Sequence, residues 1–81
     1  MISLKSKERY YVLRVDCYWD HPSFYEYHVQ KATNLHDAMK QVYKHYHDNY
    51  PFYDRPWVVL DKYKVVDSKD KVDEALKELG W

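Results

Sequence analysis

The sequence predicts one small α+β domain, in which a three-stranded, mainly antiparallel sheet carries two helices on one face. Three observations favour this class: two alternating segments separated by a turn, one segment with apolar residues at helical spacing, and a β-rich segment followed by a short helical one. A chain of 81 residues can bury only one core. We therefore expect a single domain over 1–81, with residues 1–7 as a flexible N-terminal extension.

The first strand is expected over residues 9–19, because side chains alternate there with a period of two. The apolar row is expected to face the core, and it consists of Tyr11, Leu13, Val15, Cys17 and Trp19. The other row mixes rings with charges and is expected to face water or a partner. It consists of Tyr10, Val12, Arg14, Asp16 and Tyr18.

A second strand is expected over residues 24–31, after the turn-forming residues Asp20, His21 and Pro22. The two strands would form a hairpin. The residues expected to join the core face are Tyr25, Tyr27 and Val29. Those expected beside the Tyr10 to Tyr18 row are Phe24, Glu26, His28 and Gln30.

The clearest helix follows, capped by Thr33 or Asn34, with Asp37 placed favourably in its first turn. It should end before Pro51, because the residue ahead of a proline avoids the helical region. The apolar side chains at helical spacing are Leu35, Ala38, Met39, Val42, Tyr43 and Tyr46.

The third strand is expected over residues 57–66, with an apolar phase that requires a bulge or switch near Asp61. Ser68 or Asp70 then begins a short helix that Gly80 ends, with Trp81 in the position of an apolar clamp. The order is β-β-α-β-α, and a crossover helix would place the strands in the sheet order 2-1-3. The apolar face of the short helix consists of Val72, Ala75, Leu76 and Leu79.

Composition argues against several functional classes. Thirteen basic residues balance thirteen acidic ones, so no net charge attracts the chain to duplex nucleic acid or to an anionic membrane. One cysteine cannot form an internal disulfide, which favours a reducing compartment and a cytoplasmic location. The single glycine, Gly80, excludes a glycine-rich phosphate loop.

Catalytic and metal-binding groups are also poorly placed in the sequence. Cys17 lies in the apolar row, where burial would raise its pKa and leave it inert. His45 and His47 diverge by about 200° on a helix and cannot easily share an ion. We therefore expect no enzyme activity, no metal and no cofactor. The remaining histidines, expected at the surface, are His21, His28 and His36.

Two aromatic regions are candidate contact surfaces. The segment 49–57 combines rings, prolines and an arginine, and it either presents a binding loop or folds back to seal the core. Its candidate residues are Tyr50, Phe52, Tyr53, Arg55 and Trp57. The second region is the open sheet face, whose candidate residues are Tyr10, Arg14, Tyr18 and Phe24.

The function predicted from these features is that of a non-catalytic protein-binding module, such as an accessory or inhibitor protein of a phage or mobile element. The alternative is a domain that binds single-stranded nucleic acid through rings on the open sheet face. A small metal-dependent enzyme is the third candidate. Self-association through that face or through an unpaired edge strand is left open.

Overall fold

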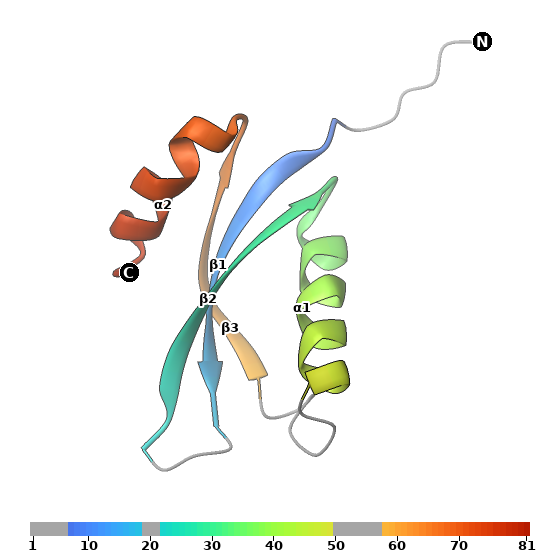
Figure 1. Ribbon diagram of the computed structural model, residues 1–81, viewed down its shortest axis with the longest axis vertical. Coiled ribbons are helices and arrows are strands. Elements are labelled where there is room, and N and C mark those ends of the chain that lie inside the picture. Colours follow the sequence, from blue (N-terminus) through green and yellow to red (C-terminus); the bar gives the residue numbers. More distant parts are fainter. Residues whose placement is uncertain (1–6, 19–21, 50–57) are drawn as a thin grey trace, which may run out of the picture.

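The computed structural model describes residues 7–18, 22–49 and 58–81, which form a three-stranded sheet with a helix on either side (Figure 1). This confirms the α+β class. The elements in chain order are β1 (Arg9–Cys17), β2 (Phe24–Ala32), α1 (Leu35–Asn49), β3 (Val58–Val66), a 3₁₀ turn (Lys69–Lys71) and α2 (Val72–Glu78).

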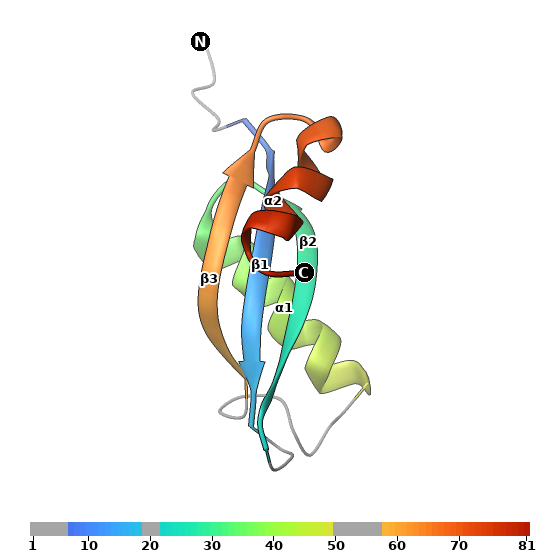
Figure 2. The ribbon, with the colours of Figure 1, turned by 90° about the vertical axis from the view of Figure 1, so that its left-hand side faces the viewer.

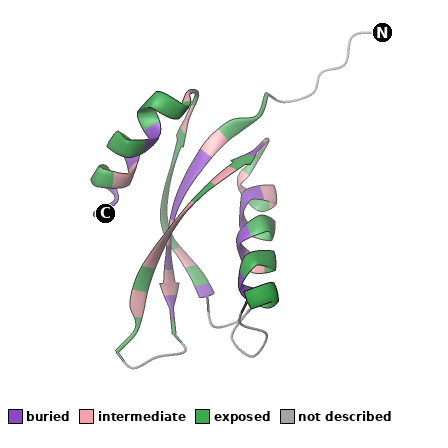
Figure 3. Ribbon diagram, viewed as in Figure 1, coloured by how far each residue is buried: buried purple, intermediate pink, exposed green. Residues whose placement is uncertain are grey.

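The sheet order is β2-β1-β3, as the sequence predicts. Both outer strands are antiparallel to β1, so β2 and β3 run in the same direction, and α1 lies in the connection between them. β1 is therefore the central strand. It is also the most buried strand, because side chains on both of its faces are covered (Figure 3).

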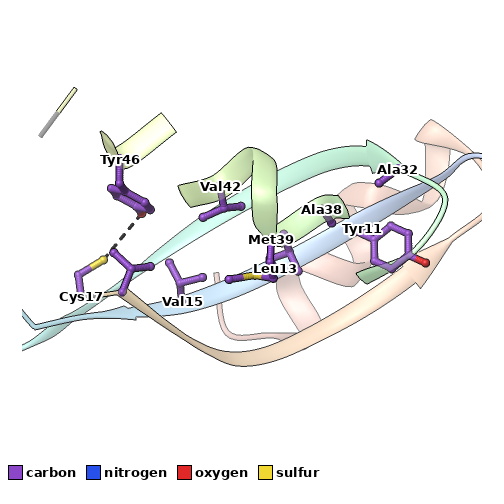
Figure 4. Close-up of a cluster of buried hydrophobic side chains, with 10 residues drawn as sticks. Tyr11, Leu13, Val15, Cys17, Ala32, Ala38, Met39, Val42 and Tyr46 are labelled. Atoms are coloured by element: carbon purple, nitrogen blue, oxygen red, sulfur yellow. Dashed lines mark hydrogen bonds between the residues drawn. The ribbon is translucent and has the colours of Figure 1, made fainter. Parts of the chain in front are cut away.

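The face of β1 expected to be buried does pack against α1, as Figure 4 shows. Asn34 begins this helix by accepting a 2.8 Å hydrogen bond from the backbone N–H of Asp37, which confirms the expected cap. The buried side chains of this α1 cluster are Tyr11, Leu13, Val15, Cys17, Ala32, Ala38, Met39, Val42, Tyr46 and Val58.

The prediction for the faces of β2 is wrong. Tyr27 pairs with Arg14 and Phe24 with Cys17, and residues paired across a ladder share a face. The side chains of Tyr25, Tyr27 and Val29 therefore lie on the face away from α1, whereas those of Phe24, Glu26, His28 and Gln30 lie beneath it. A register that differs by one residue moves every side chain to the other face.

The prediction that both helices share one face is also wrong, because α1 and α2 lie on opposite faces (Figures 1 and 2). The physical reason is a second apolar area on the sheet, centred on the fully buried Val12. The α2 cluster consists of Val12, Val72, Ala75 and Leu79, with Tyr10, Tyr27, Val66 and Leu76 packed around it.

A β-bulge in β3 confirms the irregularity expected near Asp61. Val15 pairs with Leu60 but Arg14 pairs with Lys62, which leaves Asp61 as an extra residue. The bulge explains why no single period-two phase describes the third strand.

Gly80 ends α2 with a φ of 105°, in the left-handed region that favours glycine. Its N–H donates to the carbonyl of Lys77, and the N–H of Trp81 donates to that of Leu76, both at 3.0 Å. These two hydrogen bonds form a Schellman motif. The apolar clamp expected at Trp81 is wrong, since that residue is 70% exposed.

Candidate interaction surface

The first predicted surface, Tyr50, Phe52, Tyr53, Arg55 and Trp57, lies outside the described residues. It remains a prediction.

The second predicted surface does not form one continuous site. Phe24 lies beneath α1 and packs against the α1 cluster, and Tyr10 packs against the α2 cluster. Arg14 is engaged in internal contacts, and only Tyr18 is strongly exposed. The prediction failed for two reasons: the faces of β2 were assigned wrongly, which misplaced Phe24, and α2 covers part of the face expected to be open, where Tyr10 lies.

Arg14 connects the end of α2 to the sheet through hydrogen bonds and an ion pair. Its Nε and Nη2 donate to Oδ2 of Asp61 at 2.7 and 2.5 Å, and its Nη1 donates to the carbonyl of Leu79 at 2.6 Å. The guanidinium also lies 4.4 Å from the ring centroid of Tyr25, and the Tyr27 hydroxyl donates to the same Leu79 carbonyl at 3.4 Å. Four segments far apart in sequence therefore meet at one arginine, which has a structural role.

An exposed surface lies beside this contact, and we call it the open patch. It consists of Asp16, Tyr18, Tyr25 and Val59. Asp16 of β1 is paired with both Tyr25 of β2 and Val59 of β3, so these three side chains form a row across the sheet. Figure 1 shows α2 covering only the other half of this face, nearer the start of β1 and the end of β3.

The open patch is apolar at its rings and negative at its centre. Tyr18, Tyr25 and Val59 are 46%, 49% and 47% exposed. The Tyr18 hydroxyl donates to Oδ2 of Asp16 at 3.2 Å, and this hydrogen bond with the carboxylate raises the pKa of Tyr18. The sequence contains the parts of this row, but only the register brings Tyr25 and Val59 beside Asp16.

A second polar cluster lies beneath α1, and the sequence did not reveal it. The fully buried hydroxyl of Tyr46 donates to Oε1 of Glu26 and lies 2.6 Å from Nε2 of His28. Sγ of Cys17 is 3.8 Å from the same hydroxyl (Figure 4). The hydroxyl of Tyr46 therefore ties α1 to both β1 and β2. Had the faces of β2 been predicted correctly, Glu26 and His28 would have been expected beneath α1, close to Tyr46.

The ionisation states in this cluster suit a structural role. Burial raises the pKa of Cys17 to about 11, and it also raises the pKa of Tyr46. Burial lowers the pKa of His28, and nearby His45 adds to this effect while Glu26 opposes it. At neutral pH the thiol is therefore protonated, and a thiol is a far weaker nucleophile than a thiolate.

Within residues 7–18, 22–49 and 58–81, no three His, Cys, Asp or Glu side chains are grouped so that they could hold a metal ion. None of the helices in these segments is both long and apolar enough to cross a membrane. No family model matches the chain, and neither the curated proteins nor the solved structures contain a match.

Proposed function

We propose that this chain is a non-catalytic protein-binding module that acts in the cytoplasm as an accessory or inhibitor protein, and that the open patch is its contact surface. The observation that carries the proposal is the row of Tyr25, Asp16 and Val59 across three strands, with Tyr18 beside it. These side chains are presented on a paired sheet, so little conformational freedom is lost when a partner covers them.

The chemistry of the open patch suits a protein partner. Tyrosine is enriched at interfaces because its ring supplies apolar area and its hydroxyl a hydrogen bond. Tyr18 and Tyr25 are each about half exposed here. Each is also held in place, because the Tyr18 hydroxyl donates a hydrogen bond to Asp16 and the guanidinium of Arg14 stacks on the ring of Tyr25.

Single-stranded nucleic acid fits this surface less well. Phe24 lies on the opposite face from Tyr18, and the charge of Arg14 is already paired with Asp61. Phosphates brought to the open patch would also approach the carboxylate of Asp16, and a like charge nearby opposes binding.

Site-specific photo-crosslinking tests the proposal. A benzophenone side chain is introduced at Tyr25 in the full chain, in cells of the source organism, and a matched control carries it at Lys40 on the exposed side of α1. We expect one protein adduct from position 25 that is absent from position 40. The same adducts from both positions, or none from position 25, would exclude the open patch as the contact surface.

A further inference from the structure

We propose that the open patch receives an arginine or lysine side chain from an otherwise apolar segment of its protein partner. This inference rests on the proposed function and assigns the chemistry of the partner.

Carboxylates act on the Tyr18 hydroxyl at the open patch. Asp16 and Asp61 both act on the Tyr18 hydroxyl, and the charge of each opposes its ionisation. Arg14, the nearest cation along β1, is held by Asp61 and by the carbonyl of Leu79. Lys62 pairs with Arg14 in the ladder and so lies further from the row of Asp16. Asp16 accepts a hydrogen bond from the neutral hydroxyl of Tyr18, so its own charge attracts an incoming cation.

The fold shows how such a cation would be held. The guanidinium of Arg14 stacks on the ring of Tyr25 and bonds the carboxylate of Asp61 at the same time. Tyr25 is 49% exposed, and Asp16 lies directly opposite it in the ladder. A second cation could therefore combine the same two contacts, the ring of Tyr25 and a carboxylate, now that of Asp16.

The apolar neighbours define the rest of the segment. Val59 and Tyr18 flank Asp16 and are each nearly half exposed. A cation with aliphatic or aromatic residues on either side would cover both of them while its charge reaches the carboxylate. An acidic segment would instead place like charges together.

Three capped tripeptides serve as probes, each titrated into the ¹⁵N-labelled full chain and followed by NMR: acetyl-Leu-Arg-Leu-amide, its Gln analogue and its Glu analogue. We expect the arginine peptide to shift the amide signals of Asp16, Tyr25 and Val59. Its affinity should be about fivefold higher than that of the Gln peptide, which corresponds to one exposed cation–π contact with one exposed ion pair. The Glu peptide should bind more weakly still.

An isosteric pair of variants tests the role of the carboxylate. Asp16→Asn keeps an acceptor for Tyr18 and removes the ion pair but not the contact with the Tyr25 ring. It should therefore reduce the affinity for the arginine peptide to a value between that of the unsubstituted chain and that for the Gln peptide. Asp73→Asn removes an exposed charge from α2 and should leave the affinity unchanged. Thermal unfolding of both variants would show that the fold is retained.

Several outcomes would overturn this inference. They are equal responses to the Arg and Glu peptides, no shifts with any peptide, full affinity in Asp16→Asn, or preferential binding of a single-stranded oligonucleotide at the same signals. If any of these occurs while crosslinking at position 25 still captures a specific protein, the protein-binding function stands and only the cation inference fails. Loss of that crosslink would remove the proposed function itself.

Discussion

Arg14 contributes to stability through contacts that no neighbour in the sequence provides. Its guanidinium links the central strand to Asp61 in the bulge of β3 and to the backbone carbonyl of Leu79, the residue that follows α2. The ion pair is largely shielded, with side-chain exposures of 15% and 26%. A shielded, hydrogen-bonded pair loses more when one partner is removed than an exposed pair does, because the remaining charge is poorly solvated.

Arg14→Met should therefore lower the urea midpoint more than the loss of an exposed ion pair does, since it leaves Asp61 and the Leu79 carbonyl without this donor. Arg9→Met is the matched control. Arg9 forms a 3.4 Å ion pair with Asp67 in which both side chains are exposed, and such pairs contribute about 0 to 1 kcal/mol. Urea denaturation measures both variants, and equal losses would contradict the role assigned to Arg14.

At the scale of elements, the short helix α2 depends on how it ends. Only two turns long, it would be marginal in isolation and is stabilised by packing on Val12 and by the Schellman motif at Gly80. A Cβ atom at Gly80 would lie 3.1 Å from Nη1 of Arg14 and 3.3 Å from the Tyr27 hydroxyl. The left-handed φ and these near contacts both oppose a side chain.

Gly80→Ala should accordingly cost about 1 to 2 kcal/mol, measured as a lower urea midpoint with an unchanged m-value. Lys77→Ala, an exposed change in the same helix, is the control and should shift the midpoint little. A Gly80→Ala variant as stable as the control would show that the end of α2 tolerates a different backbone conformation.

The elements and the strand order were predictable from the sequence, whereas the face of β2 and the face covered by α2 were not. The helical spacing from Leu35 to Tyr46 and the conflicting phase around Asp61 are local signals, and the structure confirms both. The face of β2 depends on which residue opposes Arg14, and that register is set across the hairpin. Since Tyr25 joins the open patch only in this register, the site could not be assembled from the sequence.

At the scale of the whole molecule, β1 separates two apolar clusters, one under each helix. The larger cluster contains Cys17, and the half-buried His28 lies beside it, so the altered pKa values of these two groups tie stability to pH. The folded state favours neutral His28, so on acidification the unfolded chain gains protons first, from about pH 6.5 downward. It also favours the Cys17 thiol, so the unfolded chain loses protons first as the pH rises from about 9 to about 11.

We therefore expect these two groups to support a stability plateau between about pH 7 and pH 9, with losses on both sides. Burial of Cys17 should account for about 2 kcal/mol of the loss by pH 11, because one unit of pKa shift corresponds to about 1.4 kcal/mol. Urea denaturation across the pH range checks this through variants. Cys17→Ala should flatten the alkaline limb, and His28→Gln, which keeps a donor for Tyr46, should flatten the acidic limb relative to the exposed control His36→Gln. Unchanged slopes in both variants would contradict the roles assigned to Cys17 and His28, because an altered pKa in the folded state must appear as a slope in the free energy of unfolding.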